Sequence, residues 1–373
     1  MTIRTDTPGK LMLCGEWAVL EMDVPCVVMA IDKKVSVKLD SAQTISIHAP
    51  DLKVEKKEGT FDGHLFEWNT SLSDSEKEKL LIAKHAVETA LKYVSQKGKT
   101  PLNFSIVTSS EDCVVNLPNK QVAKVGFGSS AAACVGIVKA VLEFHGIDAK
   151  SPHGKELVFK LACMAHFEAQ GKVGSSFDVA ASTYGGMLKY KRFDPTWLAA
   201  QSAAKKNTAQ IAQAAWPSLQ LEPLEVPKNF RLLLGYTGPD SSTKEMIRKM
   251  DQIKVEKKEE YWKIVHEIKK IVEALVPALK KNDSEKILAL IQKNRAALGR
   301  LSGLSELNLE TPKLALLSDI SEKNRGAGKL SGSGGGGVGI AVCFDPKIEE
   351  KILLEWKQAG IEPVDAKIAK RID

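Results

Sequence analysis

The chain has 373 residues, enough for two domains of ordinary size, and its 43% hydrophobic and 27% charged residues argue against a disordered protein. Its 53 Lys and Arg exceed its 46 Asp and Glu by seven, but the two signs are interleaved, as in residues 254–270. This pattern is typical of a solvated helix face and argues against a nucleic-acid-binding surface, whereas a small positive excess suits an enzyme for anionic metabolites.

The first part of the chain alternates short extended segments with helices. Alternating polar and apolar residues rich in Val, Ile, Ser and Thr predict strands at 34–40, 44–49 and 102–109. Apolar residues spaced three and four apart predict helices at 75–98, 130–145 and 155–170, each with a glycine at or just beyond its end. Three prolines without periodicity follow between 217 and 229, which indicates a boundary.

The second part has the same mixed character. Buried strands are expected at 230–238 and 338–345, and helices at 242–253, 256–281, 284–299, 312–324 and 346–360. Strands and helices intermixed in both halves favour the α+β class. We therefore expect an N-terminal domain at 1–216, a connecting segment at 217–229 and a C-terminal domain at 230–373.

The cysteines and the hydrophobic segments bear on the compartment. The six cysteines form no CxxC pair and mostly lie in apolar runs, which favours buried free thiols over disulfides or a zinc site. Charged residues precede any apolar run at the N-terminus, and no run is long enough to span a membrane. We expect a cytoplasmic protein that binds neither membrane nor nucleic acid, as a monomer or a homodimer.

A glycine-rich loop stands before the helix expected at 130–145. Gly126 and Gly128 let the backbone approach a ligand closely, and Ser129 and Ser130 follow at the helix start, where unpaired N–H groups attract phosphate. Taken alone, the pattern fits equally well a tight turn with a capping serine. It is not a P-loop, and we expect no strand before it of the kind that precedes a dinucleotide fingerprint.

Three further segments carry unusual residues. Asp178 follows Gly174-Ser175-Ser176, where an isolated Asp is usually a turn or cap residue. The glycine run within 329–342 leads directly into an apolar strand, which indicates a folded loop rather than a linker. Lys10 stands among apolar residues, where a lysine usually extends its amine to water.

Together, in this order, "GKLMLCGEWAVLE" (9–21), "KVGFGSSAA" (124–132), "AQGKVGSSFDVAASTYG" (169–185) and "KLSGSGGGGVG" (329–339) resemble the GHMP kinase family. The resemblance covers nearly the whole chain. It implies a two-domain fold with the active site in the cleft between the domains, and ATP and Mg²⁺ as cofactors. The middle motif and Trp17, which replaces a histidine common in mevalonate-phosphorylating members, favour members that phosphorylate 5-phosphomevalonate.

The resemblance also assigns roles to residues. Lys10 and Asp178 would be catalytic, the lysine at the transferring group and the aspartate orienting it. The ATP phosphates would be bound by Lys124, Gly126, Gly128, Ser129, Ser130 and Ala131. Magnesium would be bound by Ser130 and Glu168. The acceptor would be bound by Lys10, Lys172, Ser175, Ser176, Gly334 and Gly335. For the loop at 238–246, a plain helix cap is the favoured alternative to phosphate binding.

Two alternatives to a phosphate acceptor stay open from the sequence. Gly337 stands where many bacterial members with that acceptor carry Asp, and "STYGG" (182–186) also resembles members with mevalonate, a hydroxyl acceptor. A hydroxyl acceptor would need Asp178 as a base, whereas a phosphate is already largely ionised near neutral pH. A non-catalytic sensor of metabolites is disfavoured, because both Lys10 and Asp178 are retained.

Overall fold

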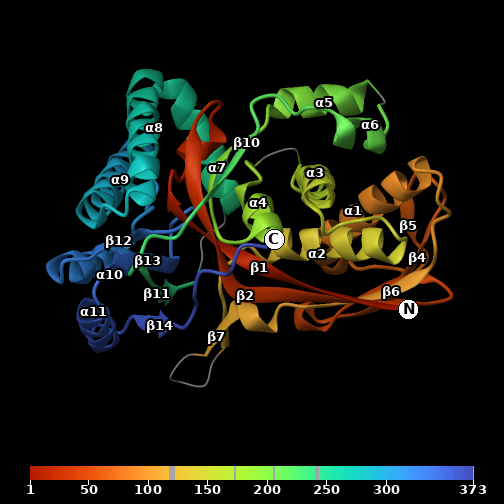
Figure 1. Cartoon of the computed structure of the whole chain (residues 1–373), viewed down its shortest axis with the longest axis horizontal. Coiled ribbons are helices and arrows are strands. Elements are labelled where there is room, and N and C mark those ends of the chain that lie inside the picture. Colours follow the sequence, from red (N-terminus) through yellow and green to blue (C-terminus); the bar gives the residue numbers. More distant parts are fainter. Residues whose placement is uncertain (117–121, 172–173, 205, 240–242, 373) are drawn as a thin grey trace.

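The computed structural model describes residues 1–116, 122–171, 174–204, 206–239 and 243–372. Two sheets lie next to each other, one from each part of the chain, and helices cover both (Figure 1). This arrangement confirms the mixed α+β class and the two-domain fold expected from the sequence.

Within the described residues the first sheet has eight strands, in the order β10-β9-β2-β6-β3-β4-β5, with β1 paired to β2. Their bounds are β1 (Thr2–Cys14), β2 (Pro25–Ser41), β3 (Ile45–Ala49), β4 (Val54–Phe61), β5 (Phe66–Trp68), β6 (Phe104–Ser109), β9 (Met187–Lys191) and β10 (Gln220–Leu224). A separate antiparallel pair, β7 (Val114–Asn116) and β8 (Val122–Lys124), lies just before the glycine loop at 126–130. β8 is therefore not the parallel strand of a dinucleotide site.

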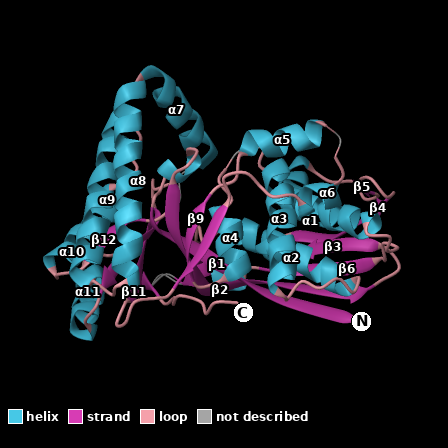
Figure 2. Ribbon diagram, turned by 45° about the horizontal axis from the view of Figure 1, so that its top comes forward, coloured by secondary structure: helices cyan, strands magenta, loops and turns pink. Residues whose placement is uncertain are grey.

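Helices pack over one face of this sheet (Figure 2). They are α1 (Asp74–Gln96), α2 (Ser129–Phe144), α3 (Pro152–Ala169), α4 (Phe177–Tyr184), α5 (Pro195–Ala203) and α6 (Thr208–Gln213), with short 3₁₀ turns at Ala18–Leu20, Pro50–Leu52 and Glu111–Cys113. The start of α1 is fixed by a capping box, in which Ser73 accepts from the Glu76 N–H and Glu76 accepts from the Ser73 N–H.

The second sheet has the order β12-β13-β11-β14 in the part of the chain that the structure describes. The strands are β11 (Arg231–Gly238), β12 (Ala327–Leu330), β13 (Gly337–Cys343) and β14 (Glu362–Val364). The helices are α7 (Thr243–Glu256), α8 (Lys258–Lys280), α9 (Ser284–Ser305), α10 (Pro312–Lys323) and α11 (Pro346–Gln358). Leu233 and Ala341 pack with α10 and α11, whereas their neighbours Leu234 and Ile340 face α8 and α9.

The two halves share a hydrophobic core on one face of β2. Its residues Val28 and Ala30 pack with α1–α3, whereas Val27 and Met29 belong to the same cluster as Leu234 and the α8 and α9 side chains. Because a strand buried on both faces has no polar alternation, the sequence predicted only 34–40 of its 17 residues. The shared core fixes the two domains against each other.

The end of the chain returns to the first domain, beside α4 (Figure 1). The Ala369 N–H donates to the Ala30 carbonyl (2.9 Å), and the Ile372 N–H donates to the Tyr184 carbonyl at the end of α4 (2.9 Å). β10 lies inside the expected connecting segment and pairs with β9 of the first sheet. The expected domain boundaries therefore stay a prediction.

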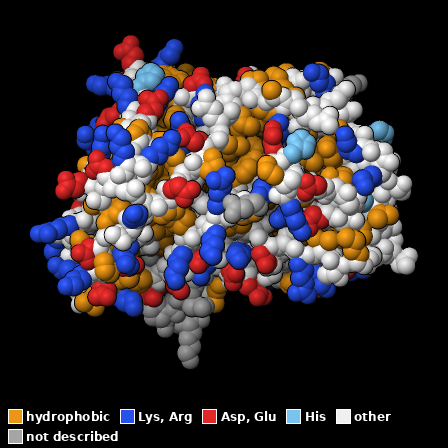
Figure 3. Space-filling model, in the orientation of Figure 1, with side chains coloured by type: hydrophobic (Ala, Val, Ile, Leu, Met, Phe, Trp, Pro, Cys, Tyr) orange, Lys and Arg blue, Asp and Glu red, His pale blue; other side chains and the backbone are white. Residues whose placement is uncertain are grey.

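The sequence also gave expectations about the cysteines, the surface charges and membrane-spanning segments. All six cysteines are buried thiols outside any disulfide, as predicted. On the face shown in Figure 3, Lys and Arg side chains are interspersed with Asp and Glu. Among the described residues, no helix is long and apolar enough to cross a membrane.

Candidate active site

The separated motifs of the sequence converge on one cavity of about 490 Å³ between the two domains. We call its two sides the N-terminal wall, formed by lining residues within 10–20, 126–130 and 170–178, and the C-terminal wall, formed by Ile247 and lining residues within 331–338. These segments are far apart in the sequence, so the fold alone brings them together.

Lys10 connects three of the motifs. Its backbone N–H donates to the Phe127 carbonyl (2.8 Å), and its Nζ donates to the Gly126 carbonyl (3.0 Å). The Nζ also lies 5.8 Å from the centre of the Phe177 ring, one residue before Asp178. Gly128 makes room for this side chain, because a Cβ there would lie 2.9 Å from the Lys10 Cγ.

The N-terminus of α2 points into the cavity without a capping side chain. Gly128 is the cap residue, with φ +73°, and it has no side chain that could accept from the first-turn N–H groups. Ser129 and Ser130 line the cavity, so the alternative in which a serine caps this helix is wrong. Uncapped N–H groups and the helix dipole together favour a bound anion.

A second helix start meets the same cavity. α4 begins after Ser176, which has φ +60° and makes no side-chain cap bond, and both Ser175 and Ser176 are buried. Asp178 is half-buried in the first turn of α4, and its Oδ1 accepts from the Val179 N–H (2.9 Å). Two positive helix ends and the Lys10 ammonium thus face one volume, with the Asp178 carboxylate beside them.

Two residues that the sequence analysis missed hold the loop before α4. The buried Arg192 donates to the Leu20 carbonyl (2.5 Å) and to the Gly174 carbonyl (2.9 Å), and burial lowers the pKa of its guanidinium. The buried Tyr190 donates its hydroxyl to the Ser175 carbonyl (2.6 Å). Leu20, Gly174 and Ser175 all line the cavity, so these contacts position its lining. Tyr190 lies within β9, which the sequence pattern did not predict.

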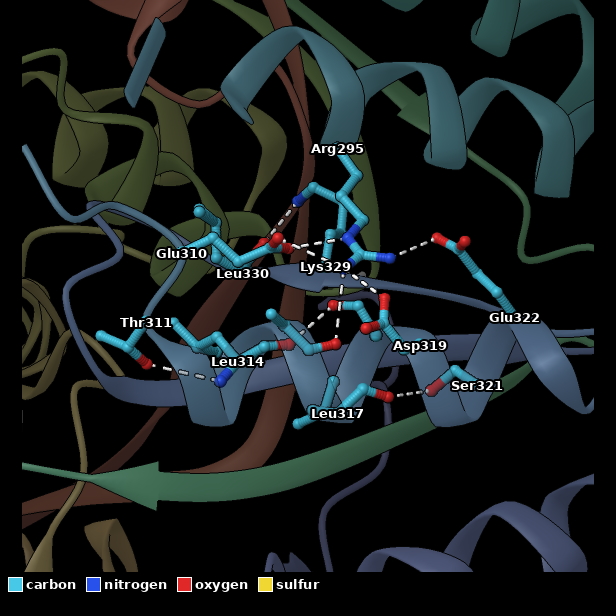
Figure 4. A network of polar contacts seen from close by, with 12 residues as sticks. Arg295, Glu310, Thr311, Leu314, Leu317, Asp319, Ser321, Glu322, Lys329 and Leu330 are labelled. Carbon is cyan, nitrogen blue, oxygen red and sulfur yellow. Dashed lines mark hydrogen bonds and ion pairs between the residues drawn. The ribbon is translucent and has the colours of Figure 1, made fainter. Parts of the chain in front are cut away.

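The glycine segment of the C-terminal wall is supported by residues outside the cavity lining. Gly334 has φ +75°, and a Cβ there would overlap the Leu309 carbonyl oxygen, which also accepts from the Gly335 N–H (2.8 Å). Next to Leu309, Glu310 accepts from Arg295 Nε (2.7 Å). Figure 4 shows Arg295 also reaching Asp319 (2.7 Å) and Glu322 (3.0 Å). Burial opposes the charge of Arg295, but its hydrogen bonds to the three carboxylates raise the pKa of the guanidinium.

Most of the predicted site residues line this cavity: Lys10, Gly126, Gly128, Ser129, Ser130, Ser175, Ser176, Asp178 and Gly334. Ala131 is buried in the first turn of α2, behind the lining. Glu168 is exposed near the end of α3 and is not among the lining residues that the structure describes. Lys172 and the side chain of Lys124 lie outside the described residues.

In the part of the chain that the structure describes, the carboxylates near the cavity form no cluster of metal ligands. Among the described residues, no group of three or more His, Cys, Asp or Glu side chains is arranged to hold a metal ion. Glu16, which the sequence analysis did not assign, lines the N-terminal wall together with Asp178. The sequence feature that could have indicated Glu16 is its position in "CGEW", where a charged residue stands among residues that the structure buries.

Comparisons with known proteins match both halves of the chain. The model "GHMP kinases N terminal domain" matches residues 82–186, and "GHMP kinases C terminal" matches residues 264–362. A phosphomevalonate kinase from a Streptomyces species is 29% identical over 97% of this chain and 96% of its own length. A mevalonate kinase from Methanocaldococcus jannaschii is 27% identical over 95% and 96%, respectively.

A solved structure shares the whole fold. It is the Streptococcus pneumoniae phosphomevalonate kinase in complex with phosphomevalonate and AMPPNP, which is 24% identical and covers 99% of this chain and 100% of its own. Its TM-score to this chain is 0.81.

Proposed function

Because the chain belongs to the GHMP kinase family, we propose that it transfers the γ-phosphoryl group of ATP to 5-phosphomevalonate, giving 5-diphosphomevalonate and ADP. One observation carries the proposal: two uncapped helix N-termini and Lys10 converge on a single cavity. Such a cavity suits two phosphate-bearing ligands, because phosphoryl transfer depends mainly on positioning and on stabilising charge.

ATP binds, in this proposal, at the start of α2. Gly126 and Gly128 allow the backbone to approach the phosphates, and the first-turn N–H groups with the Ser129 and Ser130 hydroxyls donate to phosphate oxygens. Ser130 is exposed and lines the cavity, so its hydroxyl would help to hold Mg²⁺ together with the phosphates. The metal, when bound, neutralises charge on the transferring group.

The acceptor binds at the start of α4. The hydroxyls and N–H groups of residues 175–178 provide donors for its phosphate, and Arg192 holds this loop in place through the Gly174 carbonyl. Lys10 lies between the two helix starts and stabilises charge on the group in transfer. Asp178 orients the acceptor and takes its proton when the acceptor phosphate is monoprotonated.

The choice of 5-phosphomevalonate over mevalonate rests on two supports. The Streptomyces relative, whose name gives phosphomevalonate as its substrate, shares nearly the full length of the chain at the higher identity. In addition, Trp17, which joins the two walls by donating its indole N–H to the Ser333 carbonyl (3.2 Å), stands where a histidine is common in family members that phosphorylate mevalonate. Mevalonate as acceptor is the second candidate, favoured by the 27% identical mevalonate kinase.

A coupled assay of ADP release tests the proposal. Purified protein with MgATP is offered mevalonate, 5-phosphomevalonate and 5-diphosphomevalonate in parallel, each at a range of concentrations. We expect kcat/KM to be largest with 5-phosphomevalonate. A larger value with mevalonate assigns the second candidate, and no ADP release above the no-acceptor control with any of the three contradicts both kinase assignments.

A further inference from the structure

A buried ion pair crosses the boundary between the two walls. Glu16, in the turn after β1, is 1% exposed, and its carboxylate accepts from the Nζ of Lys329, which is fully buried on β12. The other carboxylate oxygen accepts from the Nδ2 of Asn294 on α9 (2.9 Å), and Asn294 is also fully buried. Two residues of the C-terminal half thus hold one carboxylate that lines the N-terminal wall.

Stability alone does not account for this pair. Removing two charges from water opposes their burial, and apolar side chains of similar volume often stabilise a core equally well or better. The position of the pair is more informative. Lys329 lies two residues before Ser331, where the C-terminal wall begins, and Glu16 lies six residues after Lys10.

Further contacts connect the same two segments. The Met12 N–H donates to the Ser331 Oγ (3.0 Å), whose hydroxyl donates back to the Met12 carbonyl (3.1 Å). Lys329 also donates to the Leu330 carbonyl (2.6 Å), which orients the peptide leading into the glycine run. The ion pair therefore lies at the centre of a contact between the strand that carries Lys10 and the loop that faces it.

We propose that Lys329 and Asn294 are positioning residues for phosphoryl transfer: by fixing the Glu16 carboxylate, they set the distance between Lys10 and the C-terminal wall. This inference rests on the proposed kinase function. A displacement of about 1 Å between reacting groups lowers an enzymatic rate by about 10²-fold. We therefore expect kcat to fall even in a variant in which the charges of Glu16 and Lys329 are both removed, so that no unpaired charge is left in the core.

The test compares single and paired substitutions. Lys329→Met alone leaves a buried carboxylate with one neutral partner and lowers the melting temperature by about 5–15 °C. Lys329→Met combined with Glu16→Gln removes both charges, and the melting temperature returns to within a few degrees of wild type. If the pair positions the walls, kcat of this double variant stays about 10- to 10²-fold below wild type. The dissociation constant of a fluorescent ATP analogue should change little.

The chain offers a matched control. Glu21 is 6% exposed and accepts from Lys254 Nζ (2.5 Å) and from the Tyr261 hydroxyl (2.8 Å), so it also joins the N-terminal segment to helices of the second domain. Neither Glu21 nor Lys254 lines the cavity. The double variant Glu21→Gln with Lys254→Met removes a second ion pair between the same two halves, one whose lysine is 36% exposed, and leaves kcat within twofold of wild type.

Two outcomes overturn the proposal. The first is a Glu16→Gln, Lys329→Met variant with restored melting temperature and a kcat within twofold of wild type. The second is an equal loss of kcat in the Glu21→Gln, Lys254→Met control. If the first double variant does not fold, Asn294→Ala, which keeps the ion pair, serves instead: the proposal requires kcat to fall about fivefold with ATP affinity unchanged, in line with the loss of one hydrogen bond.

A readout without activity separates this inference from the proposed function. Hydrogen exchange of a peptide that contains Met12 reports the contact between the two walls directly, because the Met12 N–H donates to Ser331. Exchange of a peptide that contains Gly335, whose N–H donates to the Leu309 carbonyl, reports the order of the C-terminal wall itself. We expect exchange at these amides to rise about tenfold or more in the folded Glu16→Gln, Lys329→Met variant and to be unchanged in the control. If wild type transfers phosphate to none of the three acceptors, the function is wrong, and unchanged exchange at these amides then overturns the positioning role as well.

Discussion

The two walls of the cavity use glycine for different reasons. On the N-terminal wall, Gly128 leaves space for the Lys10 side chain, whose outer carbons can shift. On the C-terminal wall, Gly334 leaves space for the Leu309 carbonyl, which is backbone and cannot shift without moving the chain. The first wall therefore combines two helix starts with an adjustable side chain from β1, and the second presents a fixed glycine backbone supported by the Arg295 network. Substitutions on the first should change catalysis, whereas those on the second should first change stability.

The largest effect is expected from Lys10→Met. Loss of the ammonium removes a charge that stabilises the group in transfer, and kcat should fall by about 10²–10³, as is typical when one such stabilising group is lost. Folding and ATP affinity should be nearly unchanged, because the methionine keeps the volume of the side chain. Measurements are kcat by ADP release, ATP affinity by titration and the melting temperature.

The matched control for Lys10 is Lys34→Met, an exposed lysine of the neighbouring strand β2. It removes the same charge from the protein without touching the cavity, and kcat should stay within twofold of wild type. A Lys10→Met variant that kept more than about a tenth of the wild-type rate would show that the lysine does not stabilise the transferring group.

The next effect, Asp178→Asn, depends on pH. The substitution keeps the size of the side chain and removes its charge. A phosphate acceptor has its second pKa at about 6, so below that pH it needs a proton acceptor and above it the attacking oxygen is already ionised. We expect kcat to be about 10²-fold lower at pH 6, with the deficit shrinking as pH rises to 8.

Profiles of kcat against pH for wild type and Asp178→Asn, recorded with 5-phosphomevalonate, check this expectation. With a hydroxyl acceptor the deficit should not change with pH, because the hydroxyl stays protonated between pH 6 and 8. A base that removes this proton contributes about 10²–10⁴ in rate. A deficit of that size that does not change between pH 6 and 8, with mevalonate as the better wild-type substrate, would assign the mevalonate alternative.

On the C-terminal wall, Gly334→Ala should act first on stability. A left-handed backbone with a Cβ costs about 1–2 kcal/mol, and the overlap with the Leu309 carbonyl adds to that cost. Gly332→Ala is the control, since Gly332 also has a positive φ (+91°) but no atom lies within 4 Å of its Cβ position. Urea unfolding should show a larger loss for Gly334→Ala, accompanied by a raised KM. Equal losses would mean that Leu309 does not support the loop.

The two walls also differ in how far the sequence predicts them. The start of α2 follows from local chemistry, because glycines before an apolar helical run signal a helix terminus, and the structure begins the helix at Ser129, one residue from the prediction. The C-terminal wall depends on contacts with Leu309 and Arg295, which no local pattern contains. Arg192 escaped prediction for the same reason: its partners Leu20 and Gly174 are distant in the sequence.

The helices and strands that the sequence did not predict are those without a strong local signal. α4 has eight residues, too short for a helical period to be recognised, and β1 is apolar on both faces from Leu11 to Cys14. By contrast, α1 has both a capping signal and a long periodic face, and its observed bounds lie within two residues of the expected ones. Local signals thus predicted the longer helices and identified the motifs, whereas tertiary packing determined which residues of those motifs line the cavity.

The smallest effect is expected from Ser130→Ala, and it tests the helix start itself. Ser130 does not cap α2, because the cap residue is Gly128, so its loss should leave the melting temperature within about one degree of wild type. If its hydroxyl binds Mg²⁺ or a phosphate oxygen, the Mg²⁺ concentration at half-maximal rate should rise about fivefold, since one hydrogen bond contributes about 1 kcal/mol. The control is Ser202→Ala on α5, a serine whose hydroxyl donates to the Leu198 carbonyl away from the cavity lining, and its Mg²⁺ titration should match wild type. An unchanged titration for Ser130→Ala would remove this residue from the metal site and leave the N–H groups of α2 as the phosphate donors at that end of the cavity.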